Sequence, residues 1–542
     1  MTPMDTLTAE LLDAVRVSRE GLLSQKHFLE QLKVSREGLL SQEQLLTLVT
    51  AYRESLARQE QLLQAISSLT RFAAWYPPEG GAEVNGLLPT AIIRKAEQAT
   101  VAPDFLVRIK RSWIGHFYQS HLKQYPLVRR PTIWLWRNAY LIYVNHISVY
   151  FGSRTAKRWR PLVKLGDYVK TSNFPTIKVF EAERVDTPVP NVFPFEDQAY
   201  LVAPHDHYVF PPVYIAQISD ALVYGGSNLV FAHNAVIYHD LYDFERDYTS
   251  EELHGRHLID AKKKRMRLSR HDAVPQKILV AAAFVDACAP NYAHWMTEVL
   301  PRIATFCSVE QFAKIPIIVD DGLHRNIMES LAVVVGSGRE IITVPVGRAI
   351  SVDRLYVTSV TGYVPFDRRD AKLTGHSHGL FSPLALDLLK KRVLPIAKKI
   401  RMQDWPRKIY LRRTSRGRTI INEFELEKAL FDRGYVVITP ENLGFLQQVA
   451  LFKNAEKIVS ATGAAIANTI FCKPGGRICI LIAKHQNMAY WYWINILSSI
   501  GIAADHVLGD IKGDPSKGVH GDFYIDINNL IANETLFQNP DY

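Results

Sequence analysis

Two kinds of hydrophobic spacing alternate along the carboxy-terminal two thirds of the chain. Short apolar runs predict buried strands, and the longer segments between them carry apolar residues at helical spacing. We predict strands at 279–284, 315–319, 340–344, 354–357, 408–411, 435–438, 457–459 and 478–482, and helices at 293–300, 325–335, 383–401, 423–433 and 446–453. Such alternation is typical of a parallel α/β sheet.

Residues 1–75 follow a different pattern, in which leucines recur among Gln, Glu and Arg without a strand-like run. The segment 17–25 is repeated almost exactly at 34–42. The offset is not a whole number of helical turns, so the two copies would not share one face of a straight helix. We expect a helical extension, either a coiled coil that joins copies of the chain into a homo-oligomer or a helical hairpin packed on the body.

A Pro- and Gly-rich linker at 76–81 separates this extension from a region, up to about residue 160, in which basic and aromatic residues interleave. That mixture suits a membrane surface, and it also suits stacking on sugars or nucleobases. An ordinary helix with a solvated basic face explains it equally well. We expect peripheral membrane contact here rather than nucleic-acid binding.

Composition narrows the class of protein. The chain has 542 residues, 47% of them hydrophobic and 22% charged, as in soluble globular proteins with more than one domain. Its net charge of +10 favours anionic partners without choosing among them. The four cysteines show no metal-type spacing, and the amino terminus shows no signal peptide, so we expect a cytoplasmic protein. We expect the apolar window 485–504 to form a buried or amphipathic helix rather than a transmembrane one.

Neither the histidines nor the paired acids predict a metal site. His205, His207, His233 and His239 are better explained as turn and surface residues, because an H-x-H pair offers only two ligands on one face. Asp320 and Asp321 end a predicted strand, where a turn explains them as well as a divalent cation does.

A small-residue turn follows the predicted strand at 457–459. Thr462, Gly463, Ala464 and Ala465 precede a short helix, whose first backbone N–H groups have no partner within the helix. Such a turn suits a diphosphate, although close packing of helix on sheet would require the same residues.

A basic turn follows the predicted strand 408–411. Arg412, Arg413, Arg416 and Arg418 lie within it, and guanidinium groups bind phosphate oxygens in bidentate fashion. The turn is therefore either a polyphosphate clamp or a solvated basic loop.

One helix carries candidate acid–base residues. If 293–300 is helical, His294 and Glu298 lie on one face, where one residue takes a proton and the other orients it. We expect His294 to be the base, because its ordinary pKa lies near neutrality. An amphipathic helix with a polar face would show the same spacing.

Five segments together resemble glycosyltransferase family 61. They are Asn291 to Arg302, which includes Trp295; Tyr410 to Arg413; Asn422-Glu423; Pro440 to Leu443; and Gly463 to Asn468 followed by Pro474-Gly475. The resemblance covers roughly residues 185–500. It implies a GT-B fold, in which two Rossmann-like domains face a cleft, and an inverting, metal-independent transfer from a nucleotide sugar.

On this basis we expect a Rossmann-like acceptor domain at 161–385 and a nucleotide-sugar-binding domain at 386–542, preceded by the extension (1–75) and the basic–aromatic region (76–160). The donor would be bound by Arg412, Arg413, Arg418, Glu441, Thr462, Gly463, Ala464, Ala465 and Asn468, with Glu441 on the ribose. Asn291 and Trp295 would lie on the side of the acceptor, a saccharide or lipid-linked saccharide of a bacterial capsule, exopolysaccharide or lipopolysaccharide.

The chain departs from the family pattern at Thr462, where relatives carry histidine. The loss of an imidazole beside the donor phosphates motivates an alternative hypothesis, a non-catalytic scaffold in a polysaccharide assembly complex. The intact His294 and Glu298 pair favours the enzyme.

Overall fold

The computed structural model describes part of the chain. The described residues are 92–95, 117–118, 131–132, 135, 159–200, 206–248, 257–268, 275–365, 367–368, 379–400, 405–414, 417–485, 491–513, 518 and 520–536. The chain divides into two units, Met1–Gly86 and Leu87–Tyr542, and every described residue belongs to the second. The predicted helical extension and most of the basic–aromatic region lie outside the described residues.

The first sheet contains a parallel, doubly wound part. Its strands follow the order β1 (Ile92–Lys95), β15 (Glu340–Val344), β14 (Ile317–Asp320), β13 (Gln276–Ala283) and β16 (Ala349–Thr358). The helices α11 (Leu300–Ser308) and α12 (Arg325–Val335) connect β13 to β14 and β14 to β15. Reversal of the strand order next to β13 is the pattern of Rossmann-like sheets.

Beyond β16 the sheet continues mainly with antiparallel strands. The order is β7 (Val213–Tyr224), β8 (Val230–Phe231), β9 (Val236–Tyr238), β2 (Arg160–Lys164), β12 (Arg265–Leu268) and β11 (His257–Asp260), and β3 (Thr176–Phe180) pairs with β7. Only β2 and β9 are parallel in this part.

The second sheet is parallel through five consecutive strands. Its order is β21 (Val436–Ile438), β20 (Lys408–Leu411), β22 (Lys457–Ala461), β23 (Arg477–Ala483) and β24 (Ala503–Lys512). The antiparallel β25 (Asp522–Tyr524) and the parallel β5 (Asn191–Phe193) also pair with β24. The helices that accompany it are α14 (Glu423–Phe431), α15 (Phe445–Asn454), the 3₁₀ helix η7 (Ala464–Phe471), α16 (Trp491–Ser499) and α17 (Ile527–Leu536).

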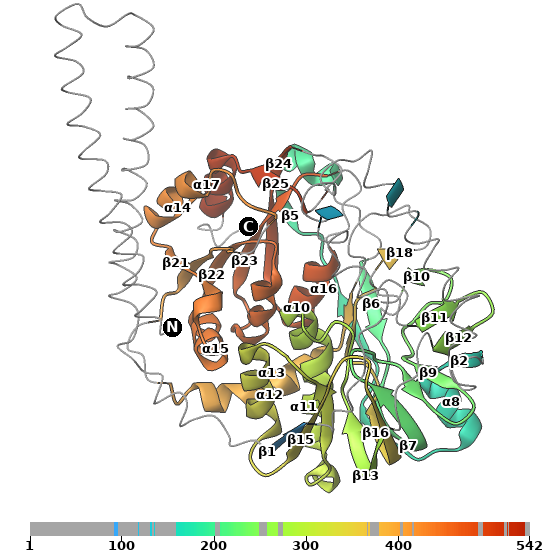
Figure 1. Cartoon of the computed structure of the whole chain (residues 1–542). Helices are drawn as coiled ribbons and strands as arrows, with labels where there is room; N and C mark the ends of the chain where they lie inside the picture. The colour runs from blue at the N-terminus through green and yellow to red at the C-terminus, as the bar shows by residue number, and fades with distance from the viewer. Residues whose placement is uncertain are drawn as a thin grey trace, which may run out of the picture. The chain divides into compact units, whose positions relative to one another are not determined.

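Helix α13 (Pro383–Ala397) joins the two sheets. It packs against α11 and α12 of the first sheet and against α15 of the second (Figure 1). Each sheet has its own hydrophobic core, the first including Ile218 and Val352 and the second including Tyr410 and Leu481. The mixed α/β fold predicted from the alternating pattern is confirmed.

Several predicted elements match the structure residue by residue, namely 325–335, 340–344 and 408–411. The predicted buried helix at 485–504 is wrong in part, because α16 ends at Ser499 and β24 begins at Ala503. Gly501, with a φ of 69°, turns the chain between them in the left-handed region that glycine tolerates. In the described part of the chain, no helix is long and apolar enough to cross a membrane.

Candidate active site

A cavity of about 390 Å³ lies at the carboxyl ends of β20 and β22, the edge where doubly wound sheets bind ligands. Its size falls within the range of small-molecule sites. Most of the residues predicted from the sequence line it. Its lining consists of Asn291, Ala293, His294, Val364, Leu411, Arg412, Arg413, Arg418, Glu441, Ser460, Ala461, Thr462, Gly463, Ala464, Ala465, Tyr492 and Trp493.

His294 and Glu298 form a hydrogen-bonded pair at one side of the cavity. His294 Nδ1 bonds to Glu298 Oε1, and the backbone N–H of Val364 donates to Glu298 Oε2 at 3.2 Å. With Nδ1 directed at the carboxylate, the imidazole keeps Nε2 for another partner. Burial lowers the pKa of His294, but the Glu298 carboxylate outweighs burial and the net shift is upward. Burial raises the pKa of Glu298, so the pair readily holds one shared proton.

The local backbone explains how His294 and Glu298 are positioned. The predicted helix 293–300 is interrupted: α10 (Tyr292–His294) is followed by a π-helical turn, η4 (Trp295–Val299), and then by α11. Such π-turns are frequent at functional sites. Strand β17 (Gly362–Tyr363) approaches this turn closely, and a Cβ at Gly362 would lie 2.3 Å from the Thr297 carbonyl oxygen. Only glycine permits the approach that brings Val364 to Glu298.

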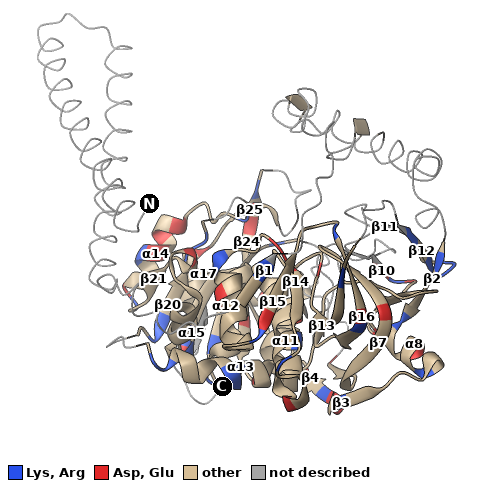
Figure 2. Cartoon of the chain, turned by 60° about the horizontal axis from the view of Figure 1, so that its bottom comes forward, with Lys and Arg blue, Asp and Glu red and all other residues tan. Residues whose placement is uncertain are grey.

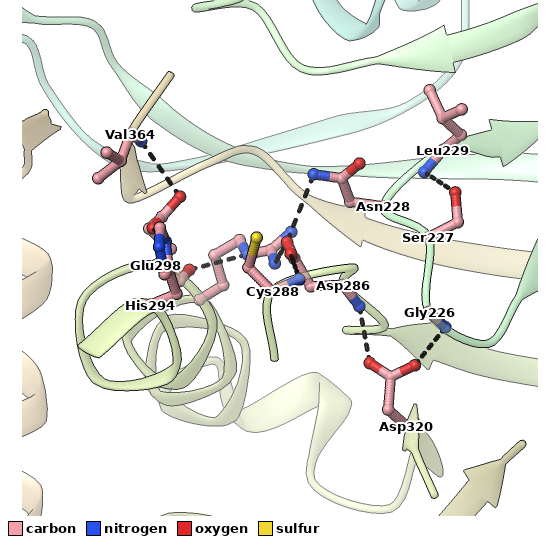
Figure 3. A network of polar contacts seen from close by, with 11 residues as sticks. Gly226, Ser227, Asn228, Leu229, Asp286, Cys288, His294, Glu298, Asp320 and Val364 are labelled. Carbon is pink, nitrogen blue, oxygen red and sulfur yellow. Dashed lines mark hydrogen bonds and ion pairs between the residues drawn. The ribbon is translucent and has the colours of Figure 1, made fainter. Parts of the chain in front are cut away.

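Behind the pair, buried charges are matched with one another (Figure 3). Arg302 donates through Nε to the Glu298 carbonyl oxygen at 2.9 Å and through Nη2 to Asp286 Oδ2 at 3.2 Å. Asp320 in turn accepts hydrogen bonds from the backbone N–H groups of Asp286 and Gly226. Asp320 is thus engaged in tying the ends of strands together, as the turn explanation predicted.

Arg413 and Arg418 line the cavity on the side of the small-residue turn, where Arg413 contacts Thr462 and Gly463. Arg413 donates to the carbonyl oxygens of Thr462 and Gly417, each at 3.3 Å. Burial lowers the pKa of Arg413, and burial together with Arg413 lowers the pKa of Arg418 to about 10. Within the described part of the chain, neither guanidinium forms an ion pair with a carboxylate. Two partly buried cations that lack an ion-pair contact among the described residues make a site for an anion.

Arg412 differs from these two arginines. It forms a bidentate ion pair with Glu427 of α14, with Nε donating to Oε1 at 2.6 Å. Its charge is therefore already balanced, although it lines the cavity. Glu441 also lines the cavity, and its charge acts on Arg413.

The small-residue turn closes this side of the cavity. Gly463 lies against Arg413, and a Cβ there would be 2.7 Å from Arg413 Nη1. The Thr462 hydroxyl accepts a hydrogen bond from Trp493 Nε1 at 3.0 Å. Thr462 therefore contacts the arginine through its carbonyl oxygen and the tryptophan through its side chain.

Three predicted site residues do not line the cavity: Glu298, which lies behind His294, and Trp295 and Asn468. Trp295 is fully buried and donates to Ser330 Oγ at 2.8 Å, so its ring has no surface for an acceptor. Asn468 is also fully buried, and it accepts from the Tyr292 hydroxyl at 2.8 Å and donates to Gln448 Oε1 at 2.7 Å. Asn468 thus connects the start of the helix carrying His294 to α15, instead of facing the donor.

The residues of the lining that were not predicted as site residues include Val364, Tyr492 and Trp493. Val364 acts through its backbone, which leaves no signal in a sequence. The two aromatics are adjacent in an apolar window, where they resemble ordinary core residues.

No group of three His, Cys, Asp or Glu residues suited to a metal ion occurs among the described residues. The surface prediction for His239 is wrong: the ring is buried between Tyr238 and Tyr363, and burial lowers its pKa well below the ordinary value. Lys and Arg residues lie beside Asp and Glu residues over much of the described chain (Figure 2), so the net charge alone would not have located the anion site.

Comparison with known families defines the class of protein: the chain is a glycosyltransferase, an enzyme with a sugar donor and an acceptor. Residues 292–479 match the family model Glycosyltransferase 61. The matched region runs from the helix of His294 through the arginine turn and the small-residue turn to β23. A search of curated proteins finds no match to the chain.

Proposed function

We propose that the chain is an inverting glycosyltransferase that moves a sugar from a nucleotide-sugar donor to a saccharide or lipid-linked saccharide acceptor, without a metal, in bacterial polysaccharide synthesis. The two doubly wound sheets would be the two halves of a GT-B fold. One observation carries the proposal: His294, which Glu298 holds through Nδ1, lines the same cavity as Arg413 and Arg418, for which the described residues supply no ion-pair partner.

The basic side would receive the donor diphosphate. As the bond to the anomeric carbon breaks, negative charge grows on the diphosphate oxygens, and preorganised donors aimed at that charge lower the barrier. Arg413 and Arg418 supply such donors, and the first N–H groups of η7 at Ala464 and Ala465 add more. Glu441 would accept hydrogen bonds from the ribose hydroxyls, consistent with its place in the lining.

The other side would activate the acceptor. His294 Nε2 removes the proton of the acceptor hydroxyl as its oxygen attacks the anomeric carbon from the face opposite the diphosphate, which inverts the configuration. Glu298 holds the imidazole through Nδ1 and stabilises the imidazolium that forms. Attack and departure in line require the sugar to lie between the two sides.

The test is incubation of the full chain with a panel of nucleotide sugars and saccharide acceptors, with product formation and anomeric configuration measured by NMR. We expect one donor to give an inverted glycoside, and we expect activity to persist in EDTA. A retained configuration, loss of activity in EDTA that a divalent cation restores, or no product with any donor would each overturn the corresponding part of the proposal. His233→Gln, a change at an exposed histidine outside the cavity lining, serves as the matched control for changes at His294.

A further inference from the structure

The space between the two sides of the cavity is bounded by one short segment of the chain. Tyr492 and Trp493, consecutive residues in the first turn of α16, both line the cavity. If the proposed function holds, the transferred sugar lies in this space, because its anomeric carbon must meet both the diphosphate and the attacking hydroxyl. The side chains that bound the space are then the ones that the sugar ring touches.

Tyr492 lies toward the side of the catalytic pair. Burial raises the pKa of its hydroxyl, and the charge of Glu298 raises it further, which requires the two groups to be close. Its ring packs edge-on against Trp493, with centroids 4.5 Å apart. The ring of Phe381, 5.9 Å away, supports it from behind. The phenol ring of Tyr492 is therefore fixed between the His294–Glu298 pair and Trp493.

Trp493 lies toward the phosphate side. Its indole N–H is held by the Thr462 hydroxyl, and only 7% of the residue is exposed. Thr462 also accepts from Arg413 through its backbone carbonyl oxygen. One residue thus sets the position of the indole relative to a guanidinium of the anion site. An imidazole at position 462 would have a different reach and would place the indole elsewhere.

We infer that Trp493, positioned by Thr462 and braced by Tyr492, selects which sugar the donor carries. The inference rests on the proposed function and adds to it a discriminating surface for the sugar ring. An indole ring that a hydrogen bond holds in place excludes sugars whose substituents would collide with its edge. The contacts of the protein with the nucleotide are not affected. Thr462 is a positioning residue here, and Trp493 makes the contact.

The experiment has two readouts on the full chain. Kinetics give kcat/KM for hexose and pentose donors and the KM of the acceptor, and titration calorimetry compares the best nucleotide sugar from the donor panel with the same nucleoside diphosphate without its sugar. The variants are Thr462→Val, which keeps the volume and the backbone but removes the hydroxyl, and Trp493→Phe, which keeps an aromatic ring. Trp405→Phe, outside this cavity lining, is the matched control. Thr462→Ser restores the hydroxyl and tests rescue.

We expect Thr462→Val and Trp493→Phe to change the ratio of kcat/KM between hexose and pentose donors by about tenfold, within the range that small pocket changes produce. Affinity for the nucleoside diphosphate should stay within about twofold, and Thr462→Ser should restore the ratio.

An unchanged donor ratio overturns the inference, as does an equal loss of affinity for both ligands, which would assign Trp493 to the nucleotide. A change confined to the KM of the acceptor overturns it as well. Failure of the proposed function would look different: the unaltered chain would then neither bind nucleoside diphosphates nor transfer a sugar. Thr462→Val keeps the inference testable if Trp493→Phe does not fold.

Discussion

The two sides of the cavity differ in whether their charged side chains have partners of opposite charge. On the side of His294, the charged groups are matched: Glu298 holds His294, and Asp286 holds Arg302. On the side of Arg413, two guanidinium groups repel each other, and the described residues supply neither with an ion-pair partner. A charged side chain with a charged partner is held in position before a substrate binds. A charged side chain without such a partner is left to take its counter-charge from an anionic substrate.

Two neighbouring arginines in the basic turn show the same difference. Arg412 and Arg413 are neighbours in sequence, yet Arg412 is neutralised by Glu427 and Arg413 is not. The side chains of adjacent residues leave a strand on opposite faces, so one packs on α14 and the other points at the small-residue turn. Proximity in sequence is therefore a poor guide to which arginine binds a ligand.

The largest effect should come from His294 itself. His294→Ala removes the proposed base and should lower kcat by at least about a hundredfold, because general-base catalysis contributes roughly 10²- to 10⁴-fold. Donor affinity, measured by calorimetry with the nucleoside diphosphate, should be unchanged. If the turnover of this variant is close to that of the His233→Gln control, the His294–Glu298 pair is not part of the mechanism.

Next in size should be loss of an unmatched arginine. Arg418→Ala should weaken binding of the nucleoside diphosphate by about ten- to a hundredfold, since a hydrogen bond to a charged group contributes about 1.5–3 kcal/mol. The control is Arg407→Ala, an exposed arginine outside this cavity lining. Equal affinity for the two variants would show that the anion binds elsewhere.

The dyad also predicts a pH dependence. His294 acts only when deprotonated, and its pKa is raised by Glu298, so the acid limb of kcat/KM should lie above the ordinary histidine value. Glu298→Gln keeps an acceptor for Nδ1 but removes the charge, and burial, the largest influence on the pKa of His294, then outweighs the remaining charge of Asp286 and lowers that pKa. The limb should move to lower pH while kcat falls. An acid limb that stays in place would mean that another group titrates.

A smaller effect is expected at Gly463. The added methyl group of Gly463→Ala would displace the tip of Arg413 and should raise the Kd of the nucleoside diphosphate several-fold with little change in thermal stability. An alanine at Gly475, where a Cβ meets open space but φ is 81°, separates backbone strain from displacement of the arginine. If both variants bind equally well, Arg413 adapts freely.

The smallest catalytic effect should follow the loss of the Tyr292 hydroxyl. Tyr292→Phe leaves a buried acceptor on Asn468 without its donor, at a cost of about 1–3 kcal/mol in the free energy of unfolding. We expect a lower Tm and nearly unchanged KM values, with the exposed Tyr524→Phe as control. A large change in donor KM would instead give Asn468 the ligand role predicted from the sequence.

The sequence allowed the strand–helix alternation and the separate motifs to be predicted, because apolar periodicity and small-residue turns are local properties. It did not show which side chains are buried. Trp295 and Asn468 belong to motif segments but face the core, and a π-turn rotates the first of them away from the cavity. Trp493 was missed because its role depends on a contact with Thr462, which lies 31 positions earlier in the chain.

Strand β5 has a practical consequence for building chimeric enzymes. Residues 191–193 precede most of the first sheet in the chain, yet they extend the second sheet along β24, and Asn191 donates to Asp505 at 3.0 Å. Phe193 lies in the core of the second sheet. If residues 386–542, the predicted nucleotide-sugar-binding domain, were cut out and grafted onto another protein, they would lack this strand and expose an unpaired sheet edge that is prone to aggregation. The graft should therefore carry 191–193 as a separate insert.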